Sequence, residues 1–151
     1  MAGFRIKRES FTLIEMMLVV VILAMIVTLS APSFHRSKIS ANEQAAIAAL
    51  KNLYTAVETY REVYSINPAN LSVMATDTAP LIPSAYLTGC NNTSAPHYQG
   101  YQFCYAPVTN TTIYTVNASP LVANSTGVRI FRIRQTGIIE ELRGTNWTSL
   151  E

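Results

Sequence analysis

A mostly apolar run over residues 11–31 restricts what this chain can fold into more than any other feature. Its only charged side chain is that of Glu15. As a helix, the run would be about 30 Å long, which matches the hydrocarbon core of a lipid bilayer. Three basic residues lie within the first ten positions, and a basic flank of this kind stays in the cytoplasm. We therefore expect residues 11–39 to form one membrane-spanning helix, with the body of the chain beyond the far side of the membrane.

Two ordinary explanations compete for this run. The first is a cleaved signal peptide, whose apolar core normally has about 7–15 residues. A cut after Ala31 would place Leu29, which is not small, three positions before it and Pro32 directly after it, so this explanation is disfavoured. The second is a plain signal anchor in which Thr12 and Glu15 form a capping box at the positive end of the helix dipole.

A second helical pattern occupies residues 40–64. Ser40 and Glu43 have the spacing of a capping box, and several alanines favour helix. Apolar side chains then recur at helical spacing: Ile47, Leu50, Tyr54, Val57 and Tyr64. We interpret this segment as an amphipathic continuation of the membrane helix and as the first element of a globular head over residues 40–151.

The rest of the head predicts a sheet. Residues 65–97 are rich in Pro, Ser, Thr and Ala, which indicates a mostly irregular connection with one short helix near residues 71–74. Over residues 98–143, β-branched and aromatic runs alternate with turn residues, which predicts three or four antiparallel strands. Residues 144–151 are assigned to a tail. The expected fold class is α+β, a long N-terminal helix packed on a C-terminal antiparallel sheet.

One strand has an irregular pattern. In residues 128–134, Val128 and Ile130 share a face with Arg132 and Arg134 if the strand is regular. A bulge near Phe131 would restore one apolar face.

Charge and motif content argue against several functional classes. The first ten residues hold three of the 11 basic and one of the nine acidic side chains, so the remainder carries eight of each and is neutral. A nucleic-acid module needs a concentrated basic face, so no nucleic-acid partner is expected. His35, His97 and Asp77 are isolated from any nucleophile, phosphate loop or zinc motif. We expect no enzymatic activity, cofactor or metal.

Cys90 and Cys104 are the two cysteines of the chain. With His97 between them they suggest a metal site, but their spacing fits no common zinc pattern and no fourth ligand is evident. Outside the cytoplasm a disulfide is the better interpretation. It would close a short loop and stabilise the head by about 3 kcal/mol. A free pair stays open if the two residues do not lie side by side.

The start of the apolar run resembles a known family. After the basic leader, the sequence Ser10-Phe11-Thr12-Leu13-Ile14-Glu15-Met16-Met17 resembles the type IV pilins and their pseudopilin relatives. The resemblance implies that a prepilin peptidase removes residues 1–10 by cutting between Ser10 and Phe11, and that Phe11 is then N-methylated. The family usually has glycine before the cut, where this chain has serine.

The resemblance also implies roles for Glu15 and Pro32. In the family, this glutamate is thought to pair with the new N-terminal amine of a neighbouring subunit, which would check the register of assembly. Pro32 falls where the family's helix carries a proline, and both a kink and a locally melted segment are compatible with it.

Three functions follow as alternatives. The first is a structural subunit of a type IV pilus that leaves the inner membrane and polymerises through its N-terminal helix with the help of an inner-membrane assembly machinery. Adhesion, surface motility or DNA uptake would be functions of the extracellular fibre. The second is a pseudopilin of type II secretion, acting in a periplasmic pseudopilus. The third is a membrane-anchored enzyme or binding protein that uses the helix as a tether.

Overall fold

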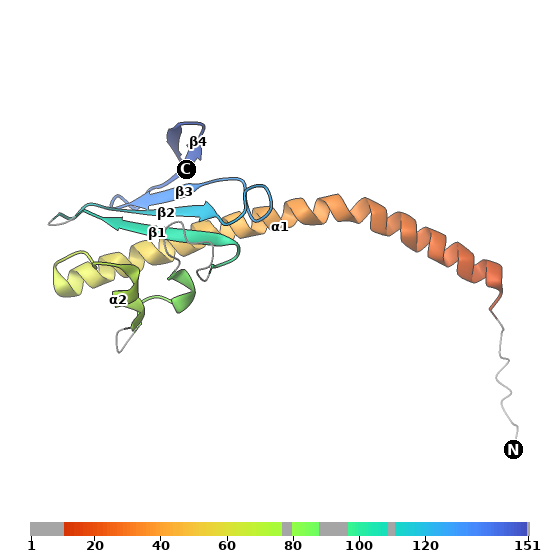
Figure 1. Ribbon diagram of the computed structural model, residues 1–151, viewed down its shortest axis with the longest axis horizontal. Helices are drawn as coiled ribbons and strands as arrows, with labels where there is room; N and C mark the ends of the chain where they lie inside the picture. The colour runs from red at the N-terminus through yellow and green to blue at the C-terminus, as the bar shows by residue number, and fades with distance from the viewer. Residues whose placement is uncertain (1–10, 77–79, 88–96, 109–110, 151) are drawn as a thin grey trace, which may run out of the picture. The chain divides into compact units, whose positions relative to one another are not determined.

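The structure is a computed structural model that describes residues 11–76, 80–87, 97–108 and 111–150 (Figure 1). Its chain forms two compact units, divided between Arg36 and Ser37. Eight elements follow one another along the chain. They are α1 (Leu13–Tyr64), α2 (Leu71–Thr76), the 3-10 turn η1 (Ser84–Tyr86), β1 (Tyr101–Pro107), β2 (Tyr114–Pro120), β3 (Phe131–Arg134), β4 (Ile139–Arg143) and β5 (Asn146–Ser149).

The two helical patterns of the sequence belong to one helix. α1 continues through Pro32 and through Ser40, so neither residue ends or begins a helix. The capping box predicted for Ser40 and Glu43 is therefore wrong. Because the helix runs on, the backbone N–H groups near Ser40 have intrahelical partners and need no cap. The carboxylate of Glu43 instead accepts hydrogen bonds from Val128 and Arg129.

The sheet is an antiparallel meander in the order β1-β2-β3-β4-β5. This confirms the α+β class, but the sheet has five strands where three or four are predicted. The additional strand, β5, lies within the segment 144–151 that the sequence pattern assigns to a tail. Its residues are mostly exposed, so they lack the apolar alternation that marks a strand.

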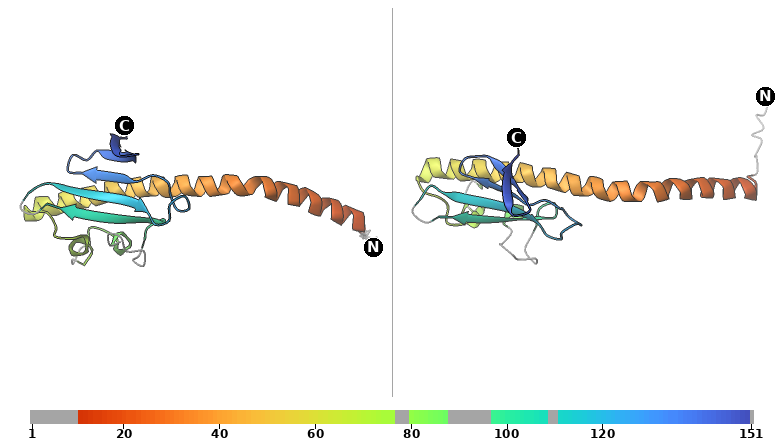
Figure 2. Two further views of the ribbon diagram at one scale, coloured as in Figure 1. Left: turned by 45° about the horizontal axis from the view of Figure 1, so that its top comes forward. Right: turned by 90° about the horizontal axis from the view of Figure 1, so that it is seen from above.

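The core of the head lies between one face of the sheet and α1. From the helix, Leu50, Leu53 and Val57 are fully buried. Alternate residues of the strands meet them, among them Phe103 of β1 and Val116 of β2. Both views in Figure 2 show the sheet lying along the part of α1 that belongs to the head. The predicted amphipathic stripe thus packs against the predicted sheet.

The irregular pattern at residues 128–134 has a simple cause. β3 begins only at Phe131, and Phe131 and Ile133 form its buried face. Val128 and Ile130 precede the strand, so they do not have to share its alternation. The bulge predicted near Phe131 is not needed to explain the pattern.

The connection between α1 and the sheet adds a small second layer of core. α2 buries Leu71 and Met74, at the position of the predicted short helix. From η1, the ring of Tyr86 packs edge-on against Tyr98, with centroids 5.1 Å apart, and against Phe103 at 5.6 Å.

Candidate functional site

The first turn of α1 carries the residues that the sequence pattern singles out for assembly. Thr12 precedes the helix, and its Oγ1 accepts a hydrogen bond from the backbone N–H of Glu15 at 3.3 Å. This is the helix-capping half of the predicted box, and it fixes Glu15 in the first turn, where the helix dipole favours a carboxylate. Phe11 lies just before the helix, whereas Ser10 lies outside the described residues.

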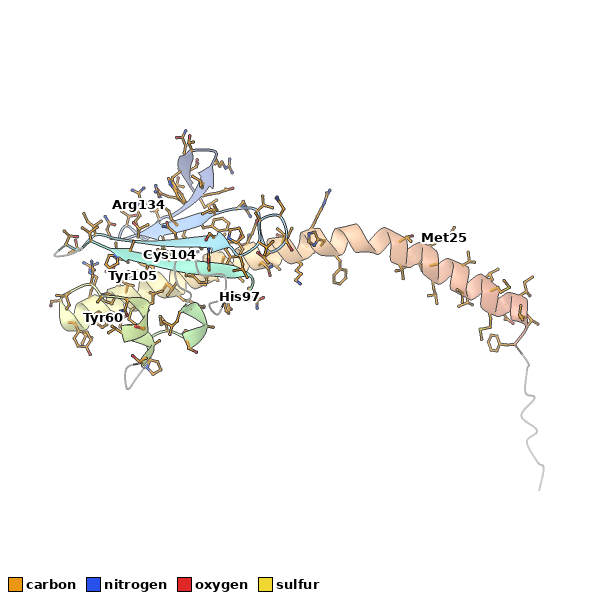
Figure 3. All side chains as sticks on the ribbon, in the orientation of Figure 1. Met25, Tyr60, His97, Cys104, Tyr105 and Arg134 are labelled. Carbon is orange, nitrogen blue, oxygen red and sulfur yellow. The ribbon has the colours of Figure 1, made fainter. Side chains whose placement is uncertain are left out.

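The apolar side chains that follow are all exposed. From Phe11 to Val27, the least exposed large apolar side chain is that of Val19, at 43%. Met25, labelled in Figure 3, illustrates how these side chains extend from the helix surface. The most apolar window of α1 has a mean hydropathy of 2.7 and is unburied, so α1 is long and apolar enough to cross a membrane. An apolar surface of this length requires a bilayer or other protein to cover it.

Glu15 lies at the edge of this apolar surface. Its neighbours one turn later on α1 are Leu18 and Val19, both exposed. A bilayer or a protein surface that removes these residues from water also surrounds the Glu15 carboxylate. A charged group within a membrane or an apolar helix bundle needs a partner. Cleavage before Phe11 would create a cationic amine four residues away along the chain. The arrangement therefore places an acid and a potential base at one end of an apolar rod.

The other predicted site residues, Pro32 and the two cysteines, do not belong to the first turn of α1. α1 is continuous through Pro32. The side chain of Pro32 is not among those that the structure describes, so the kink stays a prediction. Cys104, labelled in Figure 3, lies on β1 opposite Asn117 of β2. Cys90 lies outside the described residues, so the disulfide also stays a prediction.

The two histidines lie far apart in the chain. His35 is exposed on α1, and His97 is exposed ahead of β1; Asp77 lies outside the described residues. Within the described ranges, no three His, Cys, Asp or Glu side chains come together as a metal site would require.

Sequence reasoning missed an anchor between α1 and the sheet. Glu43 is 5% exposed. Its Oε1 accepts the backbone N–H groups of Val128 at 3.0 Å and Arg129 at 3.2 Å, and its Oε2 accepts Arg129 Nε at 2.7 Å. Burial favours the protonated acid, but these hydrogen bonds and the guanidinium charge outweigh it, so the pKa of Glu43 lies below its ordinary value. A glutamate within the buried stripe of an amphipathic helix was the available signal.

A second polar cluster lies at the other end of the head. The Tyr114 hydroxyl donates to Glu58 Oε1 at 2.8 Å, and Arg61 donates to both oxygens of Glu58, each at 2.8 Å. Burial, together with the hydrogen bond to Glu58, raises the pKa of Tyr114. Burial likewise raises the pKa of the adjacent Tyr105 to about 12. Both tyrosines are therefore neutral. Tyr114 packs and donates a hydrogen bond, whereas Tyr105 packs its ring against that of Tyr114, with centroids 6.0 Å apart.

Comparison with protein families matched the start of the chain. The family described as the prokaryotic N-terminal methylation motif matches residues 5–31. Comparisons with curated proteins and with solved structures gave no significant match. The matched residues include the predicted cleavage position, Glu15 and most of the exposed apolar helix. With the motif and an apolar helix near the N-terminus, the chain fits a membrane-anchored precursor. It carries the prepilin-type N-terminal motif of type IV pilins and pseudopilins.

Proposed function

We propose that this chain is a structural subunit of a type IV pilus and has no catalytic role. The observation that carries the proposal is the exposed apolar surface of α1, which lies within the match to the methylation motif. A prepilin peptidase removes residues 1–10, Phe11 is methylated, and the apolar helices of many copies then cover one another in a filament. Lipid covers the same surface before assembly.

In this proposal Glu15 selects the correct register between copies. Its partner is the Phe11 amine of an adjacent subunit, because processing creates that charge close to the same level of the helix. Inside an apolar bundle, where the effective dielectric is low, such a pair is stronger than in water. An incoming subunit in another register would leave the carboxylate without a partner, which is costly.

The first test is the chemistry of the mature N-terminus. Mass spectrometry of the membrane and sheared cell-surface fractions should find a chain that begins with N-methylated Phe11. An intact leader in both fractions would instead support a membrane tether. Electron microscopy of the sheared material should show long filaments. Because pseudopilins carry the same motif, a processed chain that yields no surface filaments would favour a secretion pseudopilin.

The second test separates processing from assembly. Glu15→Ala should still be cut before Phe11 but should abolish or strongly reduce filaments. Thr148→Ala, on exposed β5, is the matched control and should leave both steps unchanged. Normal filaments from Glu15→Ala would contradict the proposed role of the carboxylate.

A further inference from the structure

One end of the head carries an exposed apolar patch. Its members, called the distal patch here, are Val63, Ile66, Val108 and Ile113. They come from the end of α1, from the residues directly after it, and from the connection between β1 and β2. Asn67 joins the two segments, since its Nδ2 donates to the carbonyl oxygens of Thr111 at 2.8 Å and Ile113 at 3.3 Å.

The distal patch is hollowed. A depression of about 620 Å³ is lined by Ile66 and Val108 of the patch and by two prolines, and its polar lining residues include Arg61, Asn67 and Thr111. Ile66 is 63% exposed. A surface of this shape can receive apolar side chains from a partner.

The opposite end of the head carries a smaller apolar patch. Val122 and Val128, called the proximal patch here, are exposed on the connection between β2 and β3, with Val128 58% exposed. Pairing of Ala123 with Gly127 brings the two ends of this connection together. The connection is fixed to α1 because Asn42 Nδ2 donates to the Thr126 carbonyl at 2.8 Å and Glu43 accepts the Val128 N–H. The proximal patch is therefore held firmly on the head.

The two patches cannot cover each other within one chain. Asn42 marks the proximal end and Val63 the distal end on the same helix, which separates them by about 32 Å at 1.5 Å per residue. Figure 1 shows the connection between β2 and β3 at the end of the head opposite to the end of α1. A contact between the two patches must therefore join two copies in a head-to-tail manner.

The charges beside the patches are complementary. Glu62 is exposed next to Val63 of the distal patch, and Lys38 is exposed one turn before Asn42 at the proximal patch. Neither side chain forms an ion pair within the described part of the chain. Opposite charges at the edges of two apolar surfaces orient the surfaces toward each other and disfavour other pairings.

We propose that the distal patch of one copy docks on the proximal patch of a second copy, with Glu62 of the first paired to Lys38 of the second. This contact rests on the proposed function, because it joins heads within the filament built by the apolar helices. It uses different surfaces at its two sides, so it does not close into a dimer and can repeat along a polymer.

A zero-length cross-link tests the contact on the unaltered protein. Carbodiimide treatment of sheared wild-type filaments should join the Glu62 carboxyl to the Lys38 amine, as read by peptide mass spectrometry. Since the two residues lie about 36 Å apart on one helix, this product forms only between copies. It should be lost in Glu62→Gln. Filaments that yield both peptides uncoupled, or Glu62 joined to Lys51 alone, would overturn the contact and leave the proposed function intact.

Charge reversal supplies a second measurement. Glu62→Lys and Lys38→Glu should each lower the yield of sheared filaments, and the double variant should restore it. Thr148→Lys is the matched control, because it adds a charge to an exposed position on β5. Single variants that match this control would also overturn the contact. If the processed wild-type chain forms no filaments, the proposed function fails first and the head-to-tail contact fails with it.

Discussion

Glu43 and Arg129 are 86 positions apart in the chain, and their side chains meet with Arg129 Nε 2.7 Å from Glu43 Oε2. Arg129 Nη2 also lies 2.7 Å from the same oxygen. The guanidinium continues to Glu141 of β4, at 3.9 Å. One arginine thus connects the helix to the far part of the sheet.

Glu43→Gln should destabilise the head. The amide keeps the size of the side chain but removes the charge that accepts three hydrogen bonds, including two from backbone N–H groups. Hydrogen bonds to a charged group contribute about 1.5–3 kcal/mol, and the partial exposure of Arg129 places the expected loss near the lower end. Urea unfolding of the full chain in detergent, followed by Trp147 fluorescence, would measure it. Glu62→Gln, at an exposed position of the same helix, should change the free energy of unfolding by about 0.5 kcal/mol or less. Equal effects of the two variants would contradict the anchor.

The same carboxylate predicts acid sensitivity. The folded-state pKa of Glu43 lies below its ordinary value of 4.5, so the unfolded chain binds the proton more tightly than the folded chain. The stabilisation is complete above pH 4.5 and is lost as the pH falls through the folded pKa. The wild type should therefore lose stability more steeply than Glu43→Gln in this acidic range. Parallel pH profiles of the midpoint of urea unfolding for the two proteins would refute the assignment.

The N-terminal site could be predicted from the sequence because its signals are local. The site residues Phe11, Thr12 and Glu15 lie within five positions of one another. The length of the apolar run can also be read directly from the sequence. The helix of the head and most strands were also predictable, since burial follows their periodicity.

The anchor and the last strand could not be predicted in the same way. Arg129 is distant from Glu43 in the chain, and its backbone N–H is one of two taken by that carboxylate. The backbone N–H groups of Val128 and Arg129 donate to Glu43, and β3 begins only after them, at Phe131. This long-range contact therefore interrupts the alternation of apolar and polar residues over 128–134. β5 is short and mostly exposed, and it is paired with β4 alone, so its strand conformation rests on contacts that its own residue pattern does not show. The local periodicity of the sequence indicates neither the contact between Glu43 and Arg129 nor the pairing of β5.

Gly127 should resist substitution because of a close approach by Tyr101. A Cβ at this position would lie 2.2 Å from the Tyr101 hydroxyl oxygen and 2.6 Å from its ring. The ring is fully buried, and its hydroxyl donates to the Arg129 carbonyl at 2.9 Å. Gly127→Ala should therefore cost about 1–3 kcal/mol, the usual cost of overpacking.

A double-mutant cycle checks the cause of this cost. In a Tyr101→Leu background, the shorter side chain leaves room for the added methyl group, so Gly127→Ala should cost less than in the wild type. Urea unfolding of the four proteins gives the coupling free energy. Additive effects would show that Tyr101 is not what excludes a larger residue at Gly127.

The fifth strand should depend on the contact between Trp147 and Arg132. The guanidinium carbon of Arg132 lies 3.9 Å from the centroid of the Trp147 ring, which is a close cation–π contact. Trp147 also pairs with Leu142 across β4 and β5. Trp147→Ala should lower the stability of this hairpin by about 1 kcal/mol, and Trp147→Phe should lose less because a smaller ring still lies under the cation. Hydrogen exchange should accelerate at the amides of β4 and β5 while those of β1 and β2 keep their rates. If Thr148→Ala accelerates exchange as much as Trp147→Ala, the ring does not hold β5, and strand pairing alone keeps it on the sheet.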